Sequence, residues 1–144
     1  MKKILFLAGC CFSLAGISFS QTTVSDWFSG KKYYSIDDDV VSEWFSGKKL
    51  YQIRDGVISD WFSNKSLYEV KDHILSDYFS GKKLFELKDG TITDWWQGKN
   101  LYDYKDGVVS DWFSGKKIVQ VQGDISEEEL FAVLIDQGLL IVPK

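Results

Sequence analysis

A 17-residue period runs through most of the chain. The aromatic residues that mark it are Trp27, Trp44, Trp61, Tyr78, Trp95 and Trp112. Their neighbours align without gaps, so residues 22–123 contain six copies of one unit, of which GVISDWFSNKSLYEVKD (56–72) is typical. A unit this short cannot bury a face alone, so the copies are expected to pack together as one domain.

Each copy contains two runs of β-forming residues separated by Gly-Lys or Asn-Lys. Asp-Gly follows the second run in three copies, with His73 in place of Gly in another, and these dipeptides favour tight turns. Six hairpins in a meander, hence twelve strands, are expected. Because side chains alternate between faces and the period is odd, two tight turns per copy would flip every second hairpin. One connection per copy must therefore be longer or carry a bulge. The Lys-Asp-Gly connection, as at 88–90, looks the looser, although the sequence leaves the choice open.

Trp and Phe are adjacent in four of the six copies, and the other two copies have Tyr78-Phe79 and Trp95-Trp96 in their place. Both residues of each pair, such as Trp61 and Phe62, are expected to be neighbours in a strand and so to point to opposite faces, which leaves one ring of aromatic side chains facing outward. The alternative is that a bulge or turn folds these side chains onto their own hairpin. An exposed apolar band would imply a binding partner.

Closure of the sheet is favoured, because an open meander leaves two unpaired edges. A closed barrel of twelve strands has a radius of roughly 10 Å, which leaves room for one helix. Ser126-Glu127-Glu128-Glu129 is a capping-box pattern, and apolar residues 130–135 follow it up to Gly138. We therefore expect a mainly β fold, a closed 12-stranded antiparallel barrel of six hairpin repeats around a C-terminal apolar helix. Residues 124–144 would belong to the same domain.

The alternative arrangement places the helix on the outside of an open sheet, with residues 139–142 as an edge strand. A helix that is apolar on nearly all sides is stabilised by burial on all sides, which favours the barrel interior.

Repeated hairpins containing SDWFSGKK (25–32 and 110–117), followed by an apolar helix, resemble the β-flower repeat proteins. The expected barrel with its central helix also resembles the tubby C-terminal domain. This resemblance covers residues 22–138 and implies a shallow symmetric barrel, with lipid binding known among tubby-like relatives. The chain lacks the additional helices and long loops of the tubby domain, so no phosphoinositide site is carried over.

The N-terminus predicts export. Lys2 and Lys3 precede an apolar run that ends in Ser18-Phe19-Ser20, a small-x-small cleavage pattern, so residues 1–20 are predicted to be a secretory signal peptide. The expected location is the periplasm, the outer-membrane periphery or the medium, with no transmembrane segment after processing. In an alternative, residues 7–10 resemble a lipobox and Cys10 would carry lipid. Simple cleavage removes both cysteines, which excludes disulfides and thiolate metal sites.

An up-and-down meander sorts charge between the two ends of the barrel, because every Gly-Lys turn lies at one end and every Asp-Gly turn at the other. Cleavage would remove two of the 17 basic residues and leave a charge of about −6, so nucleic acid is not an expected partner. The candidate binding rim consists of Lys31, Lys32, Lys48, Lys49, Lys65, Lys82, Lys83, Lys99, Lys116 and Lys117 with Trp27, Trp44, Trp61, Trp95 and Trp112.

These features predict a non-enzymatic, exported binding or structural module of the bacterial cell envelope, with an envelope protein, anionic lipid or glycan as partner. One alternative is peripheral binding of anionic lipid or lipopolysaccharide through the rim. Another is a glycan-binding repeat module. The six acids that precede the aromatic pairs are equivalent, whereas acid–base catalysis needs two acids in different environments. His73, the only histidine, occupies a turn position. No catalytic group, metal or cofactor is therefore expected.

Overall fold

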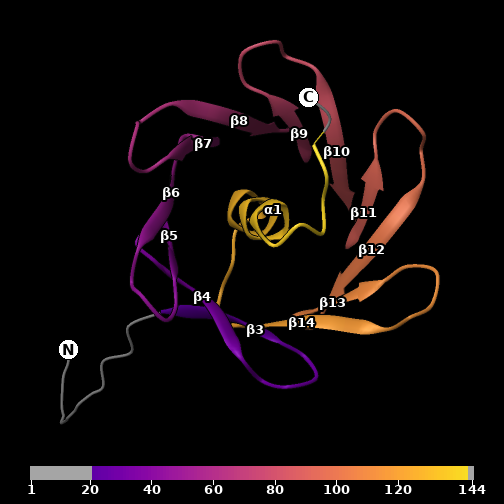
Figure 1. Ribbon diagram of the computed structural model, residues 1–144. Helices are drawn as coiled ribbons and strands as arrows, with labels where there is room; N and C mark the ends of the chain where they lie inside the picture. Colours follow the sequence, from indigo (N-terminus) through magenta and orange to yellow (C-terminus); the bar gives the residue numbers. More distant parts are fainter. Residues whose placement is uncertain (1–20, 143–144) are drawn as a thin grey trace, which may run out of the picture.

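The computed structural model describes residues 21–142 and forms a closed barrel of twelve antiparallel strands (Figure 1). Each strand pairs with its neighbours in sequence, and the last pairs with the first to close the ring. The barrel expected from the repeats is confirmed. The elements are β3 Thr22–Asp26, β4 Lys32–Asp37, β5 Val40–Glu43, β6 Lys49–Arg54, β7 Val57–Asp60, β8 Ser66–Lys71, β9 Ile74–Asp77, β10 Lys83–Lys88, β11 Thr91–Asp94, β12 Asn100–Lys105, β13 Val108–Asp111, β14 Lys117–Gln122 and α1 Glu127–Asp136. The predicted signal peptide and Cys10 lie outside the described residues.

A tight two-residue turn joins each copy to the next, with Asp-Gly at three of the five places and Asp38-Asp39 or Asp72-His73 at the other two. Between β6 and β7, Arg54 pairs directly with Val57, and the two turn residues Asp55 and Gly56 have φ of 52° and 79°. Two consecutive positive φ angles are the signature of a type I′ hairpin turn. The expectation that Lys-Asp-Gly is the looser connection is therefore wrong.

The irregular connection that the odd period requires lies instead at the Gly-Lys end. β7 ends at Asp60 and β8 begins only at Ser66, with a register shift between Ile58 and Ser59. The strand expected to continue through Trp61 and Phe62 therefore stops before them. Both residues lie in the loop, so strand alternation does not decide which way their side chains point.

The barrel interior is filled in layers by the inward side chains of the strands. Each short strand contributes one fully buried aliphatic residue at its centre, namely Val24, Val41, Ile58, Leu75, Ile92 and Val109. The long strands add two further positions, represented by Tyr34 and Ile36 in β4 and by Phe85 and Leu87 in β10. Half-buried residues such as Ser35 and Glu86 lie between these positions, as expected for a sheet with one face packed on the core.

Helix α1 fills the centre of the ring (Figure 1). Residues 130–134 are each at most 2% exposed, including Phe131 at 0%, so the helix is buried around its circumference. The expectation that the helix plugs the barrel is confirmed, and the arrangement with an outer helix is wrong. The reason is that an apolar helix without a polar stripe has no face to present to water.

Both ends of α1 are closed by the residues that the sequence indicated. Ser126 accepts from the Glu129 backbone, and the Glu129 side chain accepts from the Ser126 backbone, which completes the capping box. At the other end Gly138 has φ of 84°, and the backbone N–H groups of Gly138 and Leu139 donate to Ile135 and Leu134 in a Schellman motif. Residues 139–142 then cross the mouth of the barrel and form no strand.

Candidate binding loops at one end of the barrel

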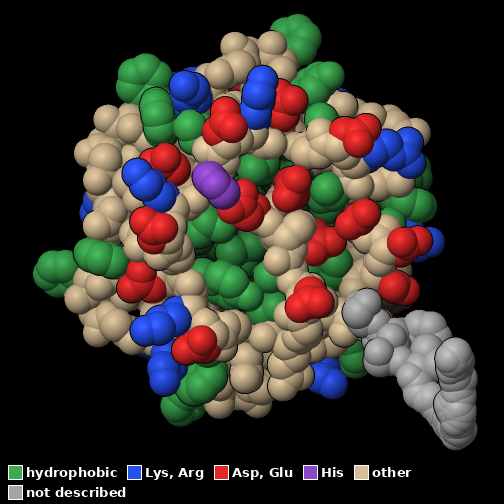
Figure 2. Space-filling view, turned by 180° about the vertical axis from the view of Figure 1, so that it is seen from behind, with side chains coloured by type: hydrophobic (Ala, Val, Ile, Leu, Met, Phe, Trp, Pro, Cys, Tyr) green, Lys and Arg blue, Asp and Glu red, His purple; other side chains and the backbone are tan. Residues whose placement is uncertain are grey.

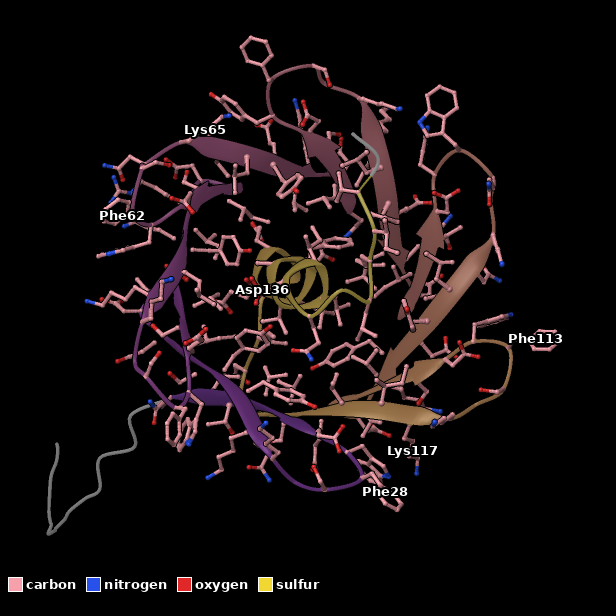
Figure 3. All side chains as sticks on the ribbon, in the orientation of Figure 1. Phe28, Phe62, Lys65, Phe113, Lys117 and Asp136 are labelled. Carbon is pink, nitrogen blue, oxygen red and sulfur yellow. The ribbon has the colours of Figure 1, made fainter. Side chains whose placement is uncertain are left out.

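Six loops join the short strand of each copy to its long strand, and we call them the aromatic–lysine loops. They are residues 27–31, 44–48, 61–65, 78–82, 95–99 and 112–116. All six leave the same end of the barrel because the sheet is an up-and-down meander. The loops extend away from the barrel axis like petals around the ring (Figure 1, Figure 3).

The acid that ends each short strand shapes the loop that follows it. The backbone N–H and the hydroxyl of Ser63 donate to Asp60 Oδ2 at 2.8 and 2.9 Å, and Lys65 N–H donates to Ser63 Oγ at 3.2 Å. The hydrogen bond from the Ser63 backbone holds the pKa of Asp60 below its ordinary value. Three further copies repeat this pattern at Asp26, Asp77 and Asp111. These acids, which the sequence showed only as a repeated charge, therefore fix the loop conformation.

The aromatic residue that begins each loop links neighbouring hairpins. Trp61 N–H donates to Leu50 O of the preceding hairpin at 3.0 Å, and Lys49 Nζ lies 4.9 Å from the centre of the Trp61 ring. The same lysine-over-indole contact recurs at Lys32–Trp44, Lys83–Trp95 and Lys117–Trp27, at 4.6, 4.8 and 4.8 Å. The Lys117–Trp27 contact joins the last hairpin to the first, so the junction that closes the ring repeats the internal ones.

In five of the six loops the second aromatic residue is a phenylalanine, and these five are the most exposed large apolar side chains in residues 21–142. The five phenylalanines at this position, Phe28, Phe45, Phe62, Phe79 and Phe113, are 94–99% exposed, and Trp96 is 69% exposed. Phe28, Phe62 and Phe113 point outward at the tips of their loops (Figure 3). The candidate rim expected from the sequence contained the tryptophans and did not include these phenylalanines.

All ten lysines of the candidate rim are exposed and lie in the aromatic–lysine loops or at the residue just after them. Lys32, Lys49, Lys83 and Lys117 turn onto an indole of the next hairpin, as described above. The structure distributes the lysines over six separate loops around the periphery and does not gather them into one continuous patch. Each loop thus presents one exposed aromatic tip beside basic side chains.

Grooves lie between neighbouring loops and have the same composition wherever they are found. One groove, of about 1040 Å³, separates the sixth loop from the first, and others of about 640 and 430 Å³ separate the fifth from the sixth and the third from the fourth. Each groove combines a lysine from one hairpin with the acid and an aromatic residue of the next.

The opposite end of the barrel carries the tight turns and the N-terminus of α1, and acidic side chains gather around it (Figure 2). His73 Nδ1 lies 2.6 Å from Glu127 Oε2, and this carboxylate raises the pKa of His73 above its ordinary value. Burial raises the pKa of Glu129, which is 6% exposed. The two ends of the barrel therefore differ in charge, as the sequence predicted.

Tyrosine hydroxyls hold the C-terminus of α1 at the loop end of the barrel. Tyr34 donates to Asp136 Oδ2 at 2.6 Å and Tyr51 to Asp136 Oδ1 at 2.9 Å, while Tyr102 donates to Leu139 O at 2.7 Å. Burial and the Asp136 carboxylate raise the pKa of both Tyr34 and Tyr51. Both oxygens of Asp136 are thus engaged in positioning the helix.

Comparison of the chain with protein-family models, curated proteins and solved structures gave no match. No helix in residues 21–142 combines the length and apolar character that crossing a membrane requires. Over the same residues, no three His, Cys, Asp or Glu side chains are arranged as ligands of one metal ion.

Proposed function

We propose that this protein is a non-enzymatic, exported module that binds an anionic lipid surface of the bacterial cell envelope through its aromatic–lysine loops. The observation that carries the proposal is the exposure of 94–99% at five phenylalanines, each on a loop with lysine and all at one end of the barrel. Burying a Phe side chain is worth about 2 kcal/mol, so five such groups in water favour a surface that can cover them. Membership of the β-flower repeat proteins is part of the same proposal.

A bilayer interface can cover exposed aromatic side chains and attract basic ones. Aromatic tips insert at the boundary between headgroups and acyl chains, and each lysine near an anionic surface contributes about 1 kcal/mol. Because the loops surround the axis at one end, several can contact a flat surface together, and weak contacts then add through their high effective concentration. The acidic end would face away from the membrane.

The repeated acids support a binding role over a catalytic one. Asp26, Asp60, Asp77 and Asp111 make the same hydrogen bonds to a serine three residues later, and these bonds lower the pKa of each of them. Acid–base chemistry instead needs groups whose environments push their pKa values apart.

Vesicle flotation tests the proposal with the mature chain and liposomes of phosphatidylglycerol or phosphatidylcholine. We expect binding to the anionic vesicles that salt weakens, since screening reduces the lysine contribution. The triple variant Phe28→Ser, Phe62→Ser, Phe113→Ser and the triple variant Lys48→Ser, Lys65→Ser, Lys116→Ser should both lose most of it. Neither set includes a lysine that covers an indole.

The matched control replaces three lysines at the opposite end, Lys71, Lys88 and Lys105, with serine and should bind as the parent does. Absence of binding to phosphatidylglycerol at low salt would contradict the proposal. An equal loss in the control would show that only the total charge matters.

A further inference from the structure

In four of the six copies, a lysine of one hairpin contacts the tryptophan that begins the loop of the neighbouring hairpin. In these copies a lysine ammonium lies over the neighbouring indole at 4.6–4.9 Å, within the range of a cation–π contact. The lysine occupies the same repeat position in each, as Lys32, Lys49, Lys83 and Lys117. The protein therefore shows repeatedly which chemical group this ring accepts.

The groove between the fifth and sixth hairpins lacks that ligand. Asn100 stands at the lysine position, and its Oδ1 accepts from Thr93 Oγ1 at 3.1 Å, which holds the side chain on its own hairpin. Within residues 21–142 no ammonium covers Trp112, whose exposure of 45% exceeds that of Trp27, Trp44 and Trp95 at 37–39%. A groove of about 640 Å³ adjoins the ring and is lined by Lys99, Asn100, Leu101, Tyr102, Asp111, Trp112 and Phe113.

We propose that Trp112 binds an organic ammonium group from outside the chain, in the position that lysine takes over the other four indoles. Tryptophan is the strongest aromatic partner of a cation, and a groove beside the ring gives access to its face. The adjacent Asp111 adds negative charge, since hydrogen bonds from Ser114 keep its pKa low and the carboxylate ionised.

Lys99 also lines this groove, and its positive charge repels a cation in the groove. The four filled copies answer the objection, because each contains the equivalent lysine, Lys31, Lys48, Lys82 or Lys116, together with the ammonium on the ring. One lysine at that position is therefore compatible with a second cation over the indole.

The third and fourth hairpins contain the same gap in a weaker form. Ser66 stands at the lysine position and Tyr78, 48% exposed, replaces the tryptophan. A phenol ring attracts a cation less strongly than an indole does, so this groove is the weaker site. The proposal does not depend on membrane binding, because both rings are accessible from solution.

The test is a titration of the mature protein with choline, followed by the indole Nε1–H resonance of Trp112, which Trp112→Phe assigns. We expect a saturable shift with a dissociation constant on the order of 1 mM, since one cation–π contact is weak. Sodium chloride and 3,3-dimethylbutan-1-ol, the neutral analogue of choline, should leave the resonance in place. A parallel titration with Nα-acetyl-lysine amide, whose side-chain ammonium is free, distinguishes a lysine side chain from a quaternary ammonium as the preferred ligand.

Two substitutions between repeat positions test the mechanism in opposite directions. Asn100→Lys supplies the internal ammonium found in the other copies and should abolish the shift of Trp112. Lys49→Asn removes the ammonium from Trp61 and should create a second responsive indole. A Trp112 shift that is equal with the neutral analogue, or that persists in folded Asn100→Lys, would overturn the proposal.

Discussion

His73 occupies the first position of the fourth repeat, where three other copies have glycine. Its φ of 68° lies in the left-handed region, which costs a residue with a Cβ roughly 1 kcal/mol. The imidazole contacts Glu127 at the start of α1, across the acidic end of the barrel. His73 therefore has a less favourable backbone conformation than glycine would have there, and it adds a contact between the sheet and the helix.

Replacing His73 with Asn should change how stability depends on pH. Because Glu127 raises the folded-state pKa of His73, the stabilising contact is fully present below the unfolded-state pKa of the imidazole and is lost as pH rises through the raised value. Asn tolerates the positive φ but does not titrate. Thermal unfolding followed from well below to well above the ordinary histidine pKa should show a decline in the parent that His73→Asn lacks. An identical pH profile in both proteins would mean that the contact adds nothing to stability.

At the scale of the elements, the places of the turns and the helix ends were predictable because each depends on local residues, whereas the choice of the tighter connection was not. Asp-Gly adopts consecutive positive φ angles with little strain, and Ser126 with Glu129 forms a capping box wherever a helix begins there. The odd repeat length predicted one irregular connection per copy. It did not predict which of the two connections is irregular, because the number of residues in a repeat does not show where the extra residue lies. A missed signal was the serine three residues after the acid, as in Asp60 and Ser63, which favours a side-chain-capped turn over a continuing strand.

The candidate rim was only partly predictable for the same reason. Its lysines and tryptophans were identified, but the contact of Lys49 with Trp61 joins residues of different hairpins, and it depends on the stagger between neighbouring strands. The exposure of Phe62 required knowledge that the strand ends at Asp60. The spacing of residues along one hairpin shows neither the contact between hairpins nor the end of the strand.

Ser126→Ala should destabilise the protein through the start of α1. The substitution removes the acceptor for Glu129 N–H and should lower the free energy of unfolding by about 1 kcal/mol, as for other N-cap serines. Urea denaturation measures the change, and Ser126→Thr, which keeps the hydroxyl, should recover most of it. A loss of stability that is equal in the Thr variant would show that the capping hydrogen bond is not the cause.

At the scale of the whole molecule, the distribution of phenylalanine separates stability from binding. Phe131 is fully buried in the helix at the centre, whereas Phe113 is 96% exposed at a loop tip. The two residues have identical side chains in opposite environments. Their substitution should therefore affect different properties of the protein.

Phe131→Ala should lower the free energy of unfolding by about 3–5 kcal/mol, because it removes a large buried side chain and leaves a cavity around which both helix and sheet are packed. Phe113→Ala should change stability by no more than about 0.5 kcal/mol. Chemical denaturation of both variants under one set of conditions checks the contrast. Similar losses in the two would contradict the burial of the helix or the exposure of the loop tips.

The helix at the centre of the ring also limits the number of repeats that the barrel can contain. Tandem repeats readily gain or lose whole copies, and the backbone hydrogen bond between the first loop residue of one hairpin and the preceding hairpin is the same at all six junctions. That bond does not itself set the number of copies. Barrel diameter, however, grows with strand number, whereas the diameter of α1 is fixed. A shorter array would leave no space for the helix, and a longer one would leave a gap around it. Helix α1, which is not part of the repeat, thus favours a ring of six copies.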